Sequence, residues 1–251
     1  MALKQHAPRK TITAQNAAAL DKDLMDSGAF SIDQLMELAG LSVSQAVYKV
    51  HPLSRGKNIL VVCGPGNNER NPTPYTGGDG LVCARHLAHY GYNPTIYYPK
   101  HGKNDLYERL KTQLRNLSVP FSDDFTASLS TTSLVVDAIF GFSFGGPLRE
   151  PYPAIISQLE STAVPVVSVD APSSWDIESG PPKEGPGARF MPEVLVSLTA
   201  PKPCVKFFKG RHFIGGRFLT KATAEKYGLD VPNYPGIDQV MEVEVEGSEK
   251  L

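Results

Sequence analysis

Three common features are missing from this sequence of 251 residues: an excess of one charge, a long apolar run and a set of paired cysteines. Its 25 Lys and Arg residues balance 26 Asp and Glu residues, so no strong field exists to attract nucleic acid or an anionic membrane. No apolar stretch approaches the roughly 20 residues that cross a bilayer. The three scattered cysteines fit neither a disulfide framework nor a zinc pattern, and they favour a reducing compartment. We therefore expect neither nucleic acid nor a membrane as a partner.

Several catalytic motifs are absent as well. The sequence has no Gly-x-Ser-x-Gly elbow and no Walker lysine, which disfavours nucleophilic hydrolysis and P-loop phosphoryl transfer. A Rossmann dehydrogenase needs an acid at the end of its second strand, and residues 97–100 supply none. We expect His86 and His89 on a helix surface, and Cys63 and Cys83 as small apolar residues of the core.

The sequence does contain a regular alternation of apolar strands and amphipathic helices. Residues 58–63 form a continuous apolar run, which is typical of a strand buried on both faces. Further strands are expected at 95–98, 134–137, 164–170 and 193–199, and helices at 13–26, 35–50, 81–90, 106–117 and 154–159. This βαβ repetition predicts an α/β fold, a three-layer, Rossmann-like, doubly wound and mainly parallel sheet with helices on both faces.

The pattern predicts one structural domain at residues 13–240. Residues 1–12 form a basic N-terminal arm, which is expected to be frayed and has a composition compatible with a mitochondrial presequence. Residues 241–251 (MEVEVEGSEKL) read as a frayed acidic tail.

Three loops that follow predicted strands carry the polar residues. The first loop holds Gly64–Asn68 and, later, Gly77–Gly80 at the start of a helix, where backbone amides suit a phosphate. The second follows the strand that ends at Asp137, and the third contains Asp170 and Ser173. The carboxyl ends of parallel strands meet at one edge of a sheet, where ligands bind. We expect convergence there of Asn68, Asp79, Asp137, Asp170 and Ser173.

Each of these features also has a purely structural interpretation, because glycines serve tight turns and a single acid often caps a helix. The set as a whole is rich in oxygen and contains neither histidine nor thiolate, so it suits a hard cation better than zinc or iron. It indicates acid–base chemistry by a carboxylate on a small molecule that carries phosphate.

These motifs resemble the YjeF N-terminal family, the NAD(P)H-hydrate epimerases, from residue 34 to about residue 227. The family pattern G-P-G-N-N-G-G-D-G is split here between residues 64–68 and 77–80. The pattern V-V-D-A-I-F-G-F-S-F stands at 135–144, S-V-D-x-P-S/T-G-W corresponds to 168–175, and L-T-x-P-K-P-C stands at 198–204. Several long motifs in the family's order are far more specific than one glycine-rich loop.

The resemblance implies an isomerase that interconverts the R and S forms of NADH or NADPH hydrated at nicotinamide C6 (NADHX and NADPHX). A separate dehydratase, dependent on ATP or ADP and specific for the S form, then restores the cofactor. The resemblance also implies a homodimer with one K⁺ per subunit. The cysteine content favours the cytoplasm, and the N-terminal composition gives mitochondria as a second location. The implied K⁺ ligands are Asn68, Asp137 and Ser173. The implied substrate-binding residues are Asn67, Asn68, Gly77, Gly78, Asp79, Gly141, Phe142, Ser143, Phe144, Gly145, Gly146, Pro147 and Asp170.

Asp170 matches the family's substrate-contacting aspartate, and we expect it to be the catalytic acid–base group. The C6 hydroxyl lies on a carbon bonded to the ring nitrogen, so its loss gives an iminium ion, whereas ring opening gives an aldehyde. Either route lets the oxygen return on the other face. Proton transfer by a positioned carboxyl group contributes roughly 10²–10⁴-fold to such a reaction.

The sequence departs from the family pattern at two places. Residues 69–76 separate Asn68 from Gly77, and their deletion restores the uninterrupted glycine-rich motif. This insertion has three interpretations: an error in the exon boundary, a tolerated loop, or a change that inactivates the enzyme. Ser174 replaces the usual glycine, and a serine costs about 1 kcal/mol or more if the position needs a positive φ.

A non-catalytic role is the alternative, because domains of this family also serve as dimerising modules in mRNA-decapping scaffold proteins, and the mammalian relative binds an apolipoprotein. A scaffold has no need for Asp137, Asp170 and Ser173 together. Their joint presence favours the enzyme.

Overall fold

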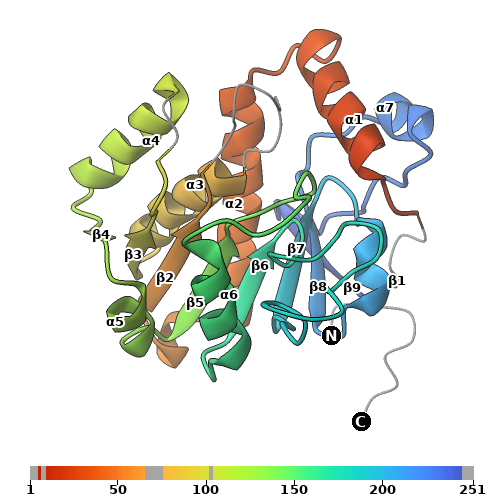
Figure 1. Ribbon diagram of the computed structural model, residues 1–251. Coiled ribbons are helices and arrows are strands. Elements are labelled where there is room, and N and C mark those ends of the chain that lie inside the picture. Colours follow the sequence, from red (N-terminus) through yellow and green to blue (C-terminus); the bar gives the residue numbers. More distant parts are fainter. Residues whose placement is uncertain (1–4, 7–9, 66–75, 102–103, 245–251) are drawn as a thin grey trace.

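Apolar strands form the centre of the molecule, as the sequence predicted. The computed structural model describes residues 5–6, 10–65, 76–101 and 104–244. In spatial order the strands are β1 (Gln5–His6), β9 (Val240–Glu244), β8 (Arg211–Gly215), β7 (Val194–Leu198), β6 (Val166–Val169), β5 (Leu134–Ala138), β2 (Asn58–Cys63), β3 (Asn93–Tyr97) and β4 (Phe121–Ser122). Every neighbouring pair is parallel except β8 and β9 (Figure 1). The predicted α/β, mainly parallel fold is confirmed.

The order of the strands reverses beside β2. From β2 the chain proceeds outward to β3 and β4, and then returns to the other side of β2 with β5 before moving out through β6, β7 and β8. The topological switch point therefore lies beyond the carboxyl ends of the paired strands β2 and β5. Doubly wound folds bind their ligands at this place.

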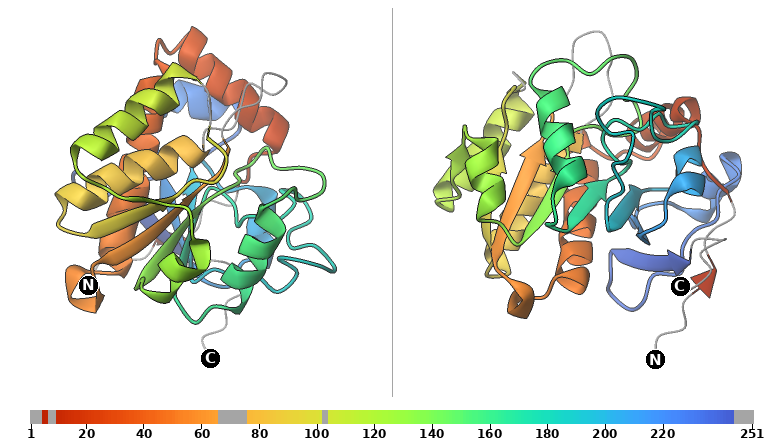
Figure 2. Two further views of the ribbon diagram at one scale, coloured as in Figure 1. Left: turned by 60° about the vertical axis from the view of Figure 1, so that its left-hand side comes forward. Right: turned by 60° about the horizontal axis from the view of Figure 1, so that its bottom comes forward.

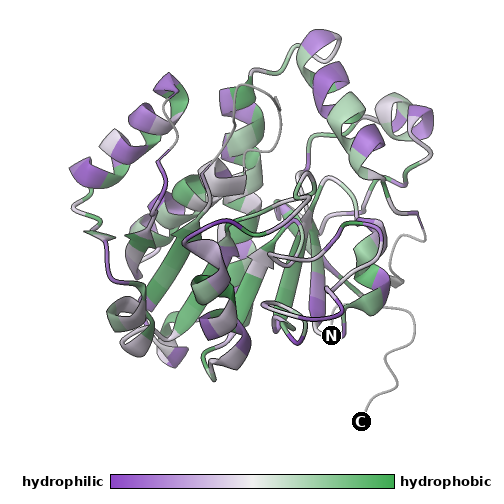
Figure 3. Ribbon diagram, in the orientation of Figure 1, coloured by the Kyte–Doolittle hydropathy of each residue, from purple (hydrophilic) through white to green (hydrophobic). Residues whose placement is uncertain are grey.

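Helices cover both faces of the sheet (Figure 2). One face carries α2 (Ile32–Val50), α3 (Thr76–His89) and α4 (Asp105–Asn116), and the other carries α5 (Phe125–Ser130) and α6 (Tyr152–Ser161). The apolar colour of the strands in Figure 3 contrasts with the mixed colour of the helices, which have one apolar side each. The central strands are buried on both faces, so their sequences are continuous apolar runs.

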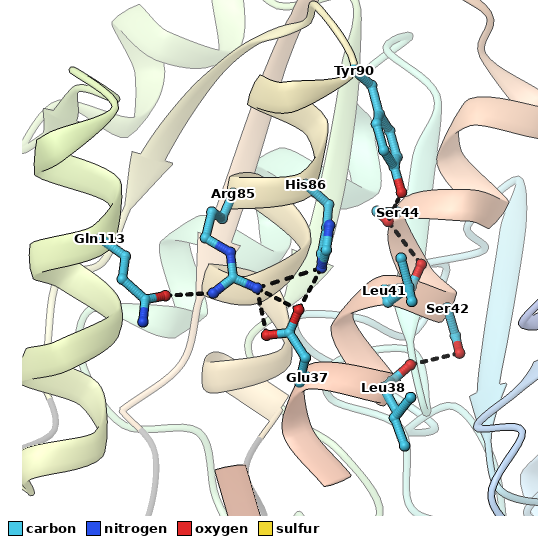
Figure 4. Close-up of polar contacts among 9 residues, drawn as sticks. All are labelled: Glu37, Leu38, Leu41, Ser42, Ser44, Arg85, His86, Tyr90 and Gln113. Carbon is cyan, nitrogen blue, oxygen red and sulfur yellow. Dashed lines mark hydrogen bonds and ion pairs between the residues drawn. The ribbon is translucent and has the colours of Figure 1, made fainter. Parts of the chain in front are cut away.

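Helix α2 begins at a capping box, because Ser31 accepts a hydrogen bond from Gln34 N and the Gln34 side chain accepts one from Ser31 N. It packs closely on α3 through Gly40, where a Cβ atom would lie 2.5 Å from the side chain of Val82. Polar contacts also join the helices: Glu37 of α2 binds Arg85 and His86 of α3, and Arg85 reaches α4 (Figure 4). These contacts join α2, α3 and α4 in the helix layer beside the switch point.

Helix α1 (Ala14–Asp26) lies beyond the carboxyl ends of the strands, in the upper right of Figure 1. Its side chains Ala17, Leu20 and Leu24 pack in an apolar cluster with residues of α2 and of α7 (Lys221–Lys226). A hydrogen bond of 2.8 Å from Ile12 N to Pro201 O fixes the segment before it. The helix therefore covers the edge where the predicted site residues end their strands.

Both ends of the chain differ from the prediction. Met241–Glu244, expected in an acidic tail, belong to β9, and residues 5–6 of the expected arm pair with Val243 and Glu244. Ile12 is buried as well. The domain therefore extends beyond the predicted limits of 13 and 240. Among the described helices, none combines the length and the apolar character needed to span a membrane.

Two short 3₁₀ helices, Leu53–Arg55 and Pro203–Phe207, complete the described elements. The first connects α2 to β2. The second follows Lys202, which enters the site described next.

Candidate active site

Two glycines allow the loops at the switch point to approach one another. A Cβ atom on Gly64, directly after β2, would lie 1.7 Å from the carbonyl oxygen of Ile139. A Cβ atom on Gly141 would lie 2.1 Å from Thr76 Oγ1 and 3.3 Å from Asp170 Oδ2. Real Cβ atoms do not approach other atoms so closely, so both positions require glycine. The loops after β2, β5 and β6 consequently meet, as the sequence predicted.

Asp137, the next-to-last residue of β5, lies at the centre of a buried hydrogen-bond network. Its Oδ2 atom accepts bonds from Ser168 Oγ at 2.7 Å and from Ser173 N at 3.0 Å. Its Oδ1 atom accepts a bond from Ser173 Oγ and a longer one, of 3.4 Å, from Ile139 N. Burial raises the pKa of Asp137, and the serine hydrogen bonds oppose that rise. The network joins β5 to the loop after β6.

The chemistry of this network fits a hard cation. Asp137 is 0% exposed, and no Lys, Arg or His among the described residues forms an ion pair with it. A buried carboxylate without a cationic partner is costly. Within the described ranges, no three His, Cys, Asp or Glu side chains are arranged to hold a metal. A cation bound beside Asp137 and Ser173 would therefore rely on hydroxyl, amide and backbone oxygens in addition to one carboxylate, which suits a hard ion.

Asp170 follows β6 and lies in a different polar environment from Asp137. Its Oδ1 atom contacts Lys202 Nζ and accepts a bond of 3.3 Å from Leu198 N, and its Oδ2 atom accepts one of 3.0 Å from Phe142 N. Asp170 is 3% exposed and Lys202 is 2% exposed. Lys202 also donates to Leu198 O at 2.8 Å. Both oxygens of Asp170 are thus held by donors from two neighbouring loops.

The backbone around Asp170 adopts an unusual conformation. Asp170, Ser174 and Thr199 have φ values of 69°, 79° and 68°. Residues other than glycine enter this region at a cost, and such residues cluster at functional sites. Position 174 thus has the positive φ that makes a serine costly there, and the hydroxyl of Ser174 is buried without a hydrogen-bond partner.

A pocket opens beside Asp170, between α1, α2, the start of α3 and the loops after β5, β6 and β7. Its polar side chains are those of Asp21, Thr76, Asp79, Asp170, Thr199 and Lys202. The apolar part of its wall is formed by Ile12, Ala17, Leu20, Ile32, Leu35, Met36, Ala39, Phe142, Leu198 and Phe218. The pocket therefore combines an apolar wall with carboxyl groups.

Two further carboxyl groups in this pocket have raised pKa values. Asp79, in the first turn of α3, is 6% exposed, and burial raises its pKa well above the ordinary value, with a further rise from Asp170 and Asp21. Burial likewise raises the pKa of Asp21, on α1, to about 7, although Lys202 opposes the rise. Groups with perturbed pKa values in a pocket are candidates for proton transfer.

Part of the predicted substrate-binding loop at 141–147 lines the pocket, and the rest lies at the surface of the protein. Gly141 is buried, and the ring of Phe142 lines the pocket with its centroid 5.7 Å from Lys202 Nζ. Ser143 is half-buried, and Phe144 stacks on Phe140 at 4.6 Å. Gly145, Gly146 and Pro147 are exposed.

Gly77 and Gly78 have packing roles in this structure. A Cβ atom on Gly77 would lie 2.4 Å from Gly64 O, and one on Gly78 would lie 2.4 Å from Met36 Sδ. These glycines allow the start of α3 to approach the end of β2. Their predicted contact with substrate stays a prediction.

Two predicted site residues, Asn67 and Asn68, lie outside the described residues, and so do residues 69–75 of the insertion. The last inserted residue, Thr76, is described. It begins α3, is buried and lines the pocket. At least this residue of the insertion is therefore part of the folded site.

The sequence did not predict Lys202 or Asp21 as site residues. Lys202 belongs to the motif at 198–204, where its position just after a central strand could have identified it. Asp21 is on a helix far from the other site residues in the sequence, and it carries no local signal. Only the packing of α1 over the sheet edge brings it there.

Comparison with known proteins agrees with this architecture. Residues 32–204 match the family described as YjeF-related protein N-terminus. A protein of Ajellomyces capsulatus named NAD(P)H-hydrate epimerase is 71% identical over 242 residues, which cover 96% of this chain and 99% of the relative. A Schizosaccharomyces pombe protein of the same name is 54% identical, with coverage of 92% and 95%.

A solved structure shows the same fold. The crystal structure of the yeast protein ynu0, YNL200c, has a TM-score of 0.86 and 41% sequence identity, and the match covers 93% of this chain and 100% of that chain.

Proposed function

This chain belongs to the family of YjeF-related protein N-terminal domains, and we propose that it is an isomerase that interconverts the R and S forms of hydrated NADH and NADPH. The fungal relatives named NAD(P)H-hydrate epimerase match it over nearly the full length. The structural observation that carries the proposal is the pocket at the switch point, in which Asp170 faces an apolar wall.

The pocket suits the nicotinamide end of the substrate. The hydrated ring is largely apolar at its saturated carbons C4 and C5 and carries one hydroxyl at C6, next to the ring nitrogen. Apolar side chains such as Leu35, Phe142 and Phe218 can cover the ring, while Asp170 lies on the polar side. Loss of the hydroxyl leaves a cation on the ring, and a buried carboxylate beside it stabilises such a charge.

Asp170 is the acid–base group of this proposal. Its two oxygens are fixed by Lys202, Leu198 N and Phe142 N, so the carboxyl group is already oriented before the substrate arrives. A fixed orientation supports catalysis because no reorganisation is needed during the reaction. Proton transfer between this carboxyl and the C6 oxygen lets the oxygen leave and return on either face.

We propose K⁺ as the cation, with Asn68, Asp137 and Ser173 as its protein ligands. The support comes from Asp137, a fully buried carboxylate without a cationic partner among the described residues. When bound, K⁺ supplies a fixed positive charge near the loops that receive the negatively charged pyrophosphate. The residues themselves hold the loop after β5 against the loop after β6.

The cellular setting of the reaction follows from the same proposal. A dehydratase specific for the S epimer would consume the product and restore NADH or NADPH. We propose a homodimer as the assembly and the cytoplasm as the compartment, with mitochondria as a second site. Sedimentation of the purified protein and imaging of the full chain test these two statements.

The direct test uses purified R-NADHX and R-NADPHX. Proton NMR should show conversion of either compound to an R/S mixture faster with the protein than in buffer alone. If neither hydrate is converted faster than in buffer, the proposed function is wrong, and a binding role in a scaffold becomes the better explanation of the fold.

A further inference from the structure

Among the residues that the structure describes, three carboxyl groups and one ammonium group line the pocket. Asp21 comes from α1, Asp79 from α3, Asp170 from the loop after β6, and Lys202 from the segment after β7. One lysine can pair with only one of the three carboxylates at close range. Like charges in a buried site favour protonation of the acids that remain unpaired.

Asp170 is the acid that Lys202 pairs with. It contacts the ammonium group directly and accepts two backbone N–H bonds. Lys202 is held in turn by Leu198 O. Both oxygens of Asp170 thus already serve as hydrogen-bond acceptors, an arrangement that presents Asp170 to the substrate as an acceptor rather than as a donor.

Asp79 has the opposite environment. Its carboxyl group is buried and lines the pocket, and no hydrogen bond or ion pair joins it to another described residue. Asp21 and Asp170 line the same pocket, and within the described part of the chain Lys202 is the cation that acts on Asp79. Cys63 at the end of β2, Cys83 on its own helix and Tyr107 on α4 are its other titratable neighbours.

We propose that Asp79 is the general acid of the epimerisation, while Lys202 holds Asp170 in place as the carboxylate beside it. The inference rests on the proposed function and divides the proton transfer between two carboxyl groups. Pairs of acids in one site whose surroundings favour different protonation states perform such divided roles. Lys202 is a positioning residue in this scheme, because it acts through Asp170.

The proton and electron balance is closed. Asp79 gives its proton to the C6 hydroxyl, the C6–O bond breaks, water leaves with both bonding electrons, and the lone pair of N1 forms the N1=C6 bond. Water then bonds to C6 on either face, the N1=C6 pair returns to N1, and the proton lost by the water passes to Asp170. Transfer of that proton from Asp170 to Asp79 restores the starting state.

The first experiment is infrared difference spectroscopy of the folded protein near neutral pH. The wild type should show the C=O stretch of a protonated carboxylic acid that is missing in Asp79→Asn and retained in Asp33→Asn, a matched change at an exposed acid that pairs with Arg109 and does not line the pocket. A band that persists in Asp79→Asn at full strength, or no such band in the wild type, overturns the proposal. This measurement does not depend on epimerase activity, so it separates the inference from the proposed function.

The second experiment is kinetic and uses R-NADHX. Asp79→Asn should lower kcat at least about 100-fold with a much smaller change in KM. Asp21→Asn removes a negative charge that favours the neutral form of Asp79, so the alkaline decline of kcat should move to lower pH. If Asp79→Asn folds and keeps the wild-type kcat, Asp79 is not the acid, although the proposed function stands. If Asp79→Asn does not fold, the test is the pH profile of Asp21→Asn. An alkaline decline of kcat at the same pH in Asp21→Asn and in the wild type overturns the proposal.

Discussion

Three of the five described non-glycine residues with a positive φ lie at the carboxyl edge of the sheet, and the other two are Ala29 and Ser118. Asp170, Ser174 and Thr199 have positive φ values, and all three follow β6 or β7. Asp170 gains an ion pair and two backbone hydrogen bonds from its position. Ser174 gains no such bond, because its hydroxyl has no partner. The strained backbone at Asp170 is therefore offset by contacts that orient its carboxyl group. Among the described contacts, no such interaction offsets the strain at Ser174.

Replacement of Ser174 by glycine should stabilise the protein. Glycine removes the cost of a side chain at φ 79° and the buried hydroxyl, and these gains exceed the extra entropy of glycine in the unfolded chain. We expect Ser174→Gly to raise the free energy of unfolding by about 1 kcal/mol in urea titrations. A matched change, Ser157→Gly on the exposed side of α6, should be destabilising instead. A Ser174→Gly protein that is less stable than the wild type would contradict this account of strain.

A buried histidine on β8 makes stability depend on pH. Nε2 of His212 lies 2.8 Å from Ser197 Oγ on β7, and burial, with a smaller effect of Lys202, lowers the pKa of His212 to about 4. In the unfolded chain the pKa of this histidine is about 6.5, so between pH 6.5 and pH 4 the unfolded chain binds a proton at His212 and the folded protein does not. This residue therefore stabilises the fold above pH 6.5, and that contribution is lost as the pH falls toward 4.

The expected loss from His212 is about 3 kcal/mol between pH 7 and pH 4, since each pKa unit corresponds to about 1.4 kcal/mol. His212→Asn should be less stable than the wild type at pH 7 and should show a smaller decline toward pH 4. His89→Asn, at an exposed histidine on α3, is the control and should keep the wild-type slope. Equal slopes for His212→Asn and the wild type in urea titrations at several pH values would show that His212 is not the cause.

At the scale of elements, the sequence predicted the central strands of the sheet but not strand β9 near one side of it. The continuous apolar runs of β2, β5 and β7 predicted strands correctly, since these strands are buried on both faces. Strand β9 was interpreted as an acidic tail because of Glu242 and Glu244. Its residues alternate, however: Met241 and Val243 are buried, and Glu242 binds Arg211 of β8. Such alternation marks a strand with one solvated face.

Removal of β9 tests this correction. A chain that ends at Gln239 loses the buried side chains of Val240, Met241 and Val243. Each contributes about 1.5–3 kcal/mol on burial, so the free energy of unfolding should fall by about 5 kcal/mol or more. A chain that ends at Glu244 keeps β9 and should match the full-length protein in thermal and urea unfolding. Equal stability of the two shortened chains would mean that residues 240–244 are dispensable, as a tail would be.

At the scale of the whole molecule, the sequence predicted which loops meet but not how their charges are distributed. Asp137 lies at the end of β5, and Asp79, Asp170 and Ser173 lie in the segments after β2 and β6. The topology of a parallel sheet is enough to bring these residues to one edge. The ion pair between Asp170 and Lys202 depends on how two loops fold over the edge. Asp21 enters the pocket because α1 crosses that edge, and no local pattern encodes this packing.

Potassium should stabilise the whole protein if the proposed site is correct. A ligand that binds only the folded state adds about 2.7 kcal/mol when its concentration is 100 times Kd. We expect a higher melting temperature in KCl than in NaCl at equal ionic strength. Ser173→Ala should reduce the difference, whereas Ser157→Ala, on the exposed side of α6, should leave it unchanged. Identical melting curves of the wild type in the two salts would count against a potassium-selective site.

The central claim is that the carboxyl group of Asp170 takes part in epimerisation in this pocket. The most direct measurement compares the wild type and Asp170→Asn in the conversion of R-NADHX in the presence of a dehydratase specific for the S form. Since the amide leaves Lys202 without its charged partner, folding is checked by circular dichroism, and the double variant Asp170→Asn, Lys202→Met removes both charges together. We predict that both variants bind NADHX and lose at least about 100-fold in the rate of conversion. A folded Asp170→Asn protein with a near-normal rate would contradict the account.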